Sequence, residues 1–172
     1  QVFAGDLDDV ESVRKAAEGT DAAYYLVHAM ISAGEDYAQR VREFAGNFVE
    51  ALKGTSCHRI IYLGGLGELG PDLSEHLRSR REVASILQSS ECATTLFRAA
   101  MIIGSGSASF EILRYLVERL PIMVTPKWVK VDTKPIAIRD VLRYLVECLW
   151  VPETAGRVID IGGKDVISYQ QM

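Results

Sequence analysis

The chain carries His76 and Arg80 four residues apart. A histidine can exchange protons, and an arginine can bind hydroxyl groups. That spacing puts both on one face of the helix predicted for about residues 74–88. An imidazole exchanges protons near neutral pH, and a guanidinium binds a ribose hydroxyl or a phosphate but cannot relay a proton. His76 is therefore a candidate general acid/base and Arg80 a candidate ligand contact. The alternative is a solvated helix face, because Arg78 and Arg81 lie in the same segment.

A second group of candidates lies at strand ends. The apolar run 59–63 breaks into Gly64 and Gly65 directly after a segment whose apolar residues have helical spacing. Helix, buried strand and glycine turn in this order are typical of a parallel α/β sheet, which binds ligands at the carboxyl ends of its strands. Arg98 ends the next predicted strand, where it would either pair with a substrate carboxylate or hold Glu82. We therefore expect a ligand-binding edge beyond these residues.

The elements that must position these side chains alternate along the chain. Hydrophobic patterning predicts strands at residues 2–4, 22–27, 59–63, 94–97 and 158–161, shorter extended pieces at 122–124 and 136–138, and helices at 8–19, 36–53, 74–88, 110–120 and 140–150. Asp8 is the expected N-cap of the first helix, with Glu11 three residues later. Strand and helix in alternation predict an α/β protein. We expect a single domain over residues 1–172, in which residues 121–172 contribute to a smaller substrate-side region.

Composition limits the classes of function. The 172 residues are 48% apolar and 24% charged, which is typical of one globular domain. A net charge of −4 argues against a nucleic-acid partner. Without an apolar run of about 18 residues, or a basic start followed by an apolar core, neither a membrane anchor nor secretion is expected, and the cytosol is the expected location. Cys57, Cys92 and Cys148 have no pattern typical of a disulfide framework or a metal site, which predicts reduced thiols and no metal.

Six segments together form a more specific pattern: residues 5–7, 24–28, the helix that carries Asn47, 59–65, 98–104 and 135–140. Through them, nearly the whole chain resembles the atypical NAD(P)H-binding branch of the short-chain dehydrogenase/reductase superfamily, the NmrA-like group. The resemblance implies a Rossmann-like doubly wound parallel sheet, with NAD or NADP across the carboxyl ends of the strands. The cofactor-binding residues that it implies are Asp6, Leu7, Leu26, Val27, His28, Tyr62, Gly64, Gly65, Arg98, Ala99 and Met101.

Several of these residues also have a purely structural interpretation. The resemblance places Asp6 and Leu7 at the adenine, but the Asp6 carboxylate would equally help to cap the next helix. It places Leu26, Val27 and His28 under the ribose and pyrophosphate. The first two would also serve as core residues, and His28 as a solvated loop residue.

The chain departs from the family at the catalytic positions. A short-chain dehydrogenase normally carries a tyrosine and, four residues later, a lysine, and this sequence contains no such pair. His76 and Arg80 hold the matching positions, Gly64 and Gly65 replace the usual serine, and Ala99 stands where relatives often have proline. Two hypotheses follow. One is an NAD(P)-dependent oxidoreductase acting on a small carbonyl or alcohol, and the other is a non-catalytic dinucleotide-binding redox sensor or assembly factor.

The resemblance also implies that the first two strands of the sheet are absent from these residues. In a sheet of order 3-2-1-4-5-6, the third and fourth strands are not neighbours. If residues 2–4 are the third strand, about 60 residues, including the glycine-rich phosphate turn and the residue that selects NAD or NADP, are missing. Exposed strand edges would then favour a homodimer. The sequence does not specify the small-molecule substrate.

Overall fold

The computed structural model describes residues 2–27, 37–66, 75–104, 108–119 and 130–172. Its centre is a four-stranded, fully parallel sheet with the order β1-β2-β3-β7. The strands are β1 (Ala22–Tyr25), β2 (Arg59–Gly65), β3 (Ala93–Ala99) and β7 (Val158–Ile161). The predicted α/β class and parallel sheet are therefore confirmed.

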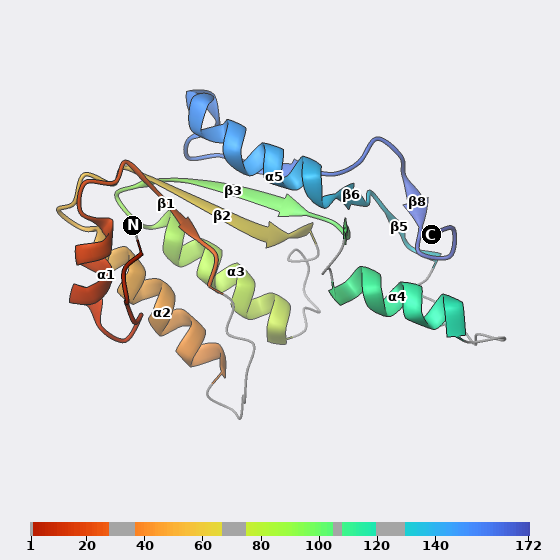
Figure 1. Ribbon diagram of the computed structural model, residues 1–172, viewed down its shortest axis with the longest axis horizontal. Helices are drawn as coiled ribbons and strands as arrows, with labels where there is room; N and C mark the ends of the chain where they lie inside the picture. The colour runs from red at the N-terminus through yellow and green to blue at the C-terminus, as the bar shows by residue number, and fades with distance from the viewer. Residues whose placement is uncertain (1, 28–36, 67–74, 105–107, 120–129) are drawn as a thin grey trace.

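Helices cover both faces of this sheet, as a doubly wound fold requires (Figure 1). On one face lie α1 (Val10–Ala17), α2 (Tyr37–Leu52) and α3 (Glu75–Gln88). On the other lies α5 (Ile138–Glu147), which continues into the short 3-10 helices Cys148–Trp150 and Pro152–Thr154. Helix α4 (Ala108–Arg119) lies beyond the carboxyl ends of the strands.

The alternation of side chains along the strands divides the core in two. In β2, Ile60 and Tyr62 are buried in the core on the α1–α3 face, whereas Ile61 is buried in the core on the α5 face. Helix α5 completes the second core with Val141 and Leu145, which are one turn apart. A continuous apolar run in the sequence thus marks a strand that is covered on both sides.

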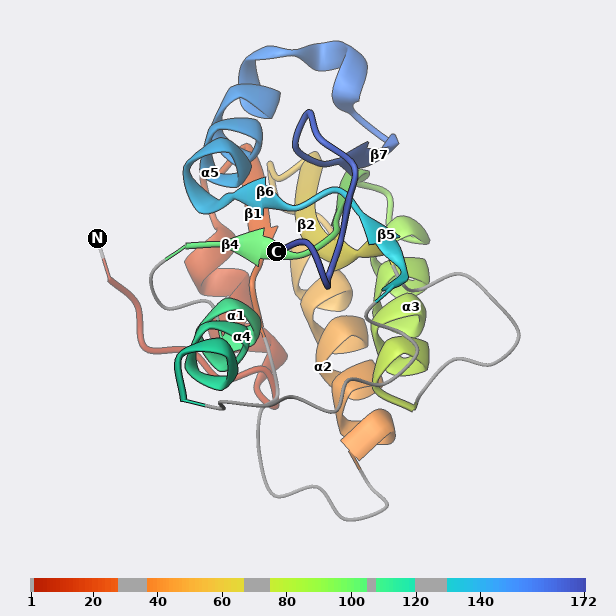
Figure 2. The same ribbon diagram turned by 90° about the vertical axis from the view of Figure 1, so that its right-hand side faces the viewer.

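Two very short strand pairs extend the structure beyond the carboxyl edge of the sheet (Figure 2). β4 (Ile102–Ile103) pairs in parallel with β6 (Ile136–Ala137), and β5 (Asp132–Thr133) pairs antiparallel with β8 (Ile167–Ser168). The predicted extended piece at 136–138 is confirmed for its first two residues, since Ile138 begins α5. The piece predicted at 122–124 lies outside the described residues.

Two local predictions are wrong. Residues 2–4 form no strand, and Val2 is 97% exposed. A strand needs a hydrogen-bonded neighbour, and among the described residues none lies beside this segment. The N-cap of α1 is Asp9, whose carboxylate accepts from the backbone N–H groups of Glu11 and Ser12 at 3.1 and 3.3 Å. Asp8 instead forms an ion pair with Arg40 at 2.6 Å.

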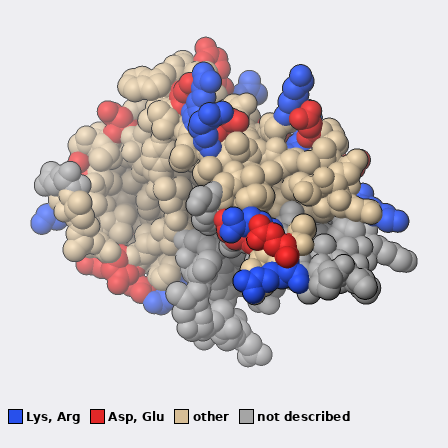
Figure 3. All heavy atoms as spheres, turned by 45° about the vertical axis from the view of Figure 1, so that its right-hand side comes forward, with Lys and Arg blue, Asp and Glu red and all other residues tan. Residues whose placement is uncertain are grey.

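The surface carries both signs of charge. Figure 3 shows basic and acidic side chains interspersed on one face of the molecule. Among the helices of the described residues, none has the length and hydrophobicity needed to cross a bilayer.

Candidate functional site

The carboxyl ends of β2 and β3 lie side by side and bring several predicted residues together. In the parallel register, Gly64 is paired with Arg98 and Gly65 with Ala99. One strand further along, Arg98 is paired with Asp160 of β7. The edge predicted from the glycine turn is thus present, with small residues at its centre.

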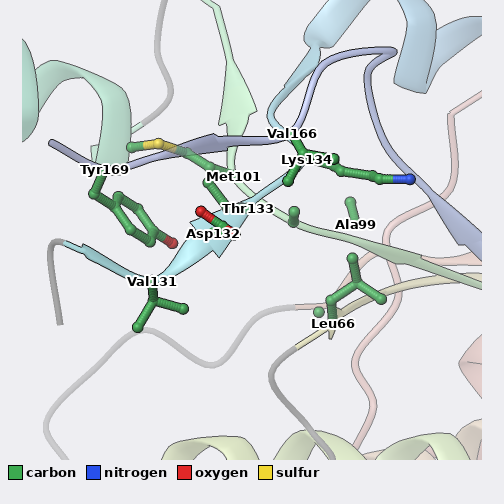
Figure 4. A pocket seen from close by; sticks show the side chains of 11 residues that line it. Leu66, Ala99, Met101, Val131, Asp132, Thr133, Lys134, Val166 and Tyr169 are labelled. Carbon is green, nitrogen blue, oxygen red and sulfur yellow. The ribbon is translucent and has the colours of Figure 1, made fainter. Parts of the chain in front are cut away.

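A pocket of about 700 Å³ opens at this edge (Figure 4). Its lining residues come from the strand ends and from the short strand pairs beyond them: Gly65, Leu66, Ala99, Ala100, Met101, Val131, Asp132, Thr133, Lys134, Val166 and Tyr169. Three of the predicted cofactor-binding residues, Gly65, Ala99 and Met101, are among them. The volume is within the range of small-molecule sites, and the lining is mainly apolar with a few polar groups.

Close backbone contacts hold the wall of this pocket in place. The N–H group of Gly163 donates to the carbonyl of Pro135 at 3.0 Å, and the N–H group of Ile136 donates to the carbonyl of Met101 at 2.9 Å. A Cβ on Gly163 would lie only 2.2 Å from the Pro135 carbonyl oxygen, and one on Gly162 would lie 2.8 Å from the Cβ of Lys134. Only glycine permits this approach, which fixes the backbone next to Lys134.

The charged side chains of the pocket lie at opposite ends. In Figure 4 the ammonium group of Lys134 extends past Ala99, whereas Asp132 and the hydroxyl of Tyr169 lie toward the other end. Within the described residues, neither Lys134 nor Asp132 forms an ion pair. The pocket therefore offers a cation at one end and hydrogen-bonding oxygens at the other.

Arg98 does not provide a second cation to the pocket. Its Nε and Nη2 atoms donate to the two carboxylate oxygens of Asp160 at 2.6 and 2.9 Å. Glu82, the structural partner expected from the sequence, is paired with Arg42 at 2.7 Å. The parallel register places Asp160 directly beside Arg98, whereas Glu82 lies on α3, and this explains why the expected partner is wrong.

The tyrosines of β1 and β2 belong to the protein interior. Tyr62 is 7% exposed and its ring packs against Tyr25 with a centroid distance of 6.0 Å. Burial raises the pKa of Tyr25, as does the neighbouring Tyr62, and burial also raises the pKa of Tyr24, whose hydroxyl donates to the carbonyl of Leu145 at 2.7 Å. The phenols of Tyr24 and Tyr25 are therefore poor proton donors. The side chain of Tyr62 is not among those that line the pocket.

Leu26 and Val27 leave the sheet at the end of β1 and are 66% and 43% exposed. The interpretation of them as core residues is wrong. Their predicted contact with the cofactor stays a prediction. His28, which follows them, lies outside the described residues.

The segment of Asp6 and Leu7 is fastened to the helices. The Asp6 carboxylate accepts from the N–H group of Asp8 at 3.0 Å, and the Leu7 carbonyl accepts from the Asn47 side-chain amide at 2.7 Å. Asn47 thus satisfies a backbone group. These contacts give Asp6 a local structural role before the first helix, and its contact with adenine stays a prediction.

His76 and Arg80 both lie in α3, as predicted, one turn apart. The side chain of His76 lies outside the described residues, and Arg80 is partly buried. Arg78 and Arg81 are exposed, so at least these two arginines form the solvated face that the sequence suggested. The catalytic role of His76 and Arg80 stays a prediction.

No protein-family model matches the chain, and no curated protein matches its sequence. Solved structures do match. UDP-glucuronic acid 4-epimerase from Bacillus cereus, in complex with NAD, has a TM-score of 0.76 at 18% identity over 96% of this chain and 61% of that one. A nucleoside-diphosphate-sugar epimerase from Staphylococcus aureus has a TM-score of 0.73 at 19% identity, over 95% and 55%. A short-chain dehydrogenase/reductase from Veillonella parvula has a TM-score of 0.64 at 15% identity, over 95% and 72%.

This chain has a Rossmann-like fold. At such identities the likeness concerns the fold alone, and the chain spans less than two thirds of the length of the two epimerases.

The polar residues of the pocket were not predicted from the sequence, among them Asp132, Lys134 and Tyr169. The first two belong to or follow the two-residue strand β5, and Tyr169 follows its partner β8. Strands this short have no hydrophobic period to detect. One usable signal existed, because Lys134 directly precedes the segment 135–140 that carries part of the family resemblance.

Proposed function

We propose that this chain binds NAD or NADP across the carboxyl ends of β1, β2 and β3, and that it belongs to the NmrA-like group of short-chain dehydrogenases/reductases. The observation that carries the proposal is the pocket at the ends of β2 and β3, because predicted cofactor-binding residues line it. The Bacillus epimerase of similar fold is a complex with NAD. In open α/β sheets, ligands bind in the crevice outside the carboxyl ends of the strands.

The residues at this edge fit a dinucleotide. Gly64, Gly65 and Ala99 have little or no side chain, so a planar ring can approach the strand ends closely. Leu26 and Val27 offer exposed apolar surface next to them. The combination of small, apolar and open positions suits a ligand that is large and partly aromatic.

The proposed activity is oxidoreduction of a small carbonyl or alcohol in the pocket. A bound nicotinamide supplies or accepts the hydride. Lys134 would hold a negatively charged group of the substrate, and Asp132 or the Tyr169 hydroxyl would accept hydrogen bonds from substrate hydroxyls. His76 is the proposed proton carrier, because histidine is the side chain that most often serves in general acid–base catalysis.

One sequence feature favours the alternative of a non-catalytic dinucleotide-binding sensor or assembly factor. The chain contains no tyrosine with a lysine four residues later. The phenols of Tyr24 and Tyr25 do not substitute for it, because their pKa values are raised by burial.

Turnover separates the two functions. The full-length protein is incubated with NADH or NADPH and a panel of small carbonyls with and without a carboxylate, and cofactor oxidation is followed by absorbance. Oxidoreduction predicts turnover that His76→Ala abolishes. If the protein binds the cofactor without turnover, and His76→Ala does not change that binding, the oxidoreductase hypothesis is contradicted and the non-catalytic sensor is supported.

Lys134 can be tested within the same assay. Lys134→Gln is expected to raise KM for carboxylate-bearing substrates about tenfold, with little change in cofactor affinity, because it removes a cation that forms no ion pair with the described residues. Lys15→Gln, an exposed lysine on α1, is the matched control. Equal KM values in wild type and Lys134→Gln would show that Lys134 does not contact the substrate.

A further inference from the structure

Two cysteines lie together at the end of the sheet opposite the proposed cofactor site. Cys57 lies two residues before the start of β2, and Cys92 directly precedes β3, the neighbour of β2 in the sheet. The N–H group of Ala93 donates to the carbonyl of His58 at 2.9 Å, which extends the pairing of the two strands to this end. The register of neighbouring parallel strands therefore brings the two thiols into one place.

The two side chains share the same surroundings. Cys57 is 6% exposed and Cys92 8%, and both belong to the core on the α1–α3 face. The Cys92 thiol donates to the carbonyl of Cys57 at 3.2 Å. Both are free thiols. The contact between the Cys92 sulfur and the Cys57 backbone makes the two residues neighbours, as a disulfide requires.

A small oxidant has a route to this pair. A cavity of about 210 Å³ is lined by both cysteines, and the exposed residues His58 and Glu91 stand at its rim. This volume holds a molecule of the size of hydrogen peroxide with room to spare. The buried thiols are thus in contact with a space that small solutes enter.

We propose that Cys57 and Cys92 form an intramolecular disulfide when the protein meets a hydroperoxide. The Cys57 thiolate attacks the O–O bond, an S–O bond forms, and one water leaves after protonation, which gives a sulfenic acid on Cys57. Cys92 sulfur then attacks the sulfenic sulfur, the S–O bond breaks, and a second water leaves. The sum is two thiols and one hydrogen peroxide to one disulfide and two waters, with the peroxide as the two-electron oxidant.

The order of attack follows from the surroundings of Cys92. Burial, the neighbouring Cys57 thiol and the hydrogen bond to it raise the pKa of Cys92 to about 11. Because the thiolate is the nucleophile, Cys92 is the poor first attacker and serves as the resolving thiol.

Cys148 provides an internal control. It is buried on the opposite face of the sheet, and its thiol donates to the carbonyl of Leu145 at 3.1 Å. Burial raises its pKa as well. It resembles the other two in burial but has no cysteine beside it, so it should stay reduced under the same treatment.

The test is peptide mapping of the folded full-length protein after hydrogen peroxide treatment and thiol blocking. Trypsin releases Cys57 within residues 54–59, Cys92 within residues 82–98 and Cys148 within residues 144–157. The expected product is the 54–59 peptide linked to the 82–98 peptide, at least about tenfold more abundant than any link to Cys148. Dithiothreitol should restore three free thiols.

Two variants complete the experiment. Cys92→Ala should replace the cross-link by a sulfenic acid on Cys57, which dimedone traps, while Cys148→Ala should leave the cross-link unchanged. Far-UV circular dichroism confirms that each variant is folded. Blocked, unlinked Cys57 and Cys92 in the oxidised wild type, or links to Cys148 of equal abundance, would overturn the proposal.

Discussion

The guanidinium of Arg98 is held by both oxygens of Asp160, so this residue at a strand end has a structural partner, and its predicted contact with the cofactor stays a prediction. Arg98 is 17% exposed at its side chain and Asp160 51%, which leaves the pair partly screened by solvent. Bidentate geometry partly compensates for this screening.

We expect Arg98→Ala and Asp160→Ala each to lower the free energy of unfolding by about 1 kcal/mol, because each leaves its partner without the bidentate contact. The double variant should cost little more than either single one, since the two residues act as a unit. Urea denaturation of the four proteins measures this coupling. Additive losses would mean that Arg98 and Asp160 do not depend on each other.

At the scale of elements, the turn after β7 and the strand β5 depend on each other. Gly163 donates to Pro135, and its missing Cβ makes room for that carbonyl. Gly46 is different, because a Cβ added in the middle of α2 would meet nothing within 4 Å.

We therefore expect opposite effects of the same substitution. Gly163→Ala should lower the free energy of unfolding by about 1–3 kcal/mol, because the backbone must move away from Pro135. Gly46→Ala should raise it by about 0.5–1 kcal/mol, because alanine restricts the unfolded chain and favours the helix. Thermal and urea unfolding check both values. Equal effects of the two variants would show that the contact at Gly163 is not tight.

The longer elements were predictable from the sequence because burial imposes a period on them. The apolar run of β2 and the spacing of Val141 and Leu145 in α5 both report directly which faces are covered. The short strands β5 and β8 were not predictable, since two residues carry no period. The pocket residues that they supply, Asp132 among them, were therefore missed.

Side-chain partners were less predictable than elements. The sequence suggested Glu82 for Arg98, but the partner comes from a strand 62 residues later, which only the sheet order reveals. The predicted N-cap of α1 was one residue too early. Asp8 and Asp9 are both suitable capping residues, and in the structure Asp9 caps the helix while Asp8 forms an ion pair with Arg40. The contact between Cys57 and Cys92 likewise depends on strand register and not on their spacing in the sequence.

At the scale of the whole molecule, the described sheet is open at β1, which is paired only with β2. An unpaired edge is a surface on which another strand can add. The homodimer and the cytosolic location expected from the sequence stay predictions. The chain spans 61% and 55% of the lengths of the two epimerases, and its activity stays a proposal.

A fluorescence titration of the full-length protein with NADH and NADPH tests whether a dinucleotide binds at the carboxyl edge of this sheet. We expect saturable binding of at least one of them by wild type and by the control variant Gly46→Ala. We expect binding at least about tenfold weaker for Gly65→Val, because Gly65 lines the pocket and valine adds bulk there. Absence of saturable binding, or equal affinity of Gly65→Val and wild type, would contradict dinucleotide binding at this edge.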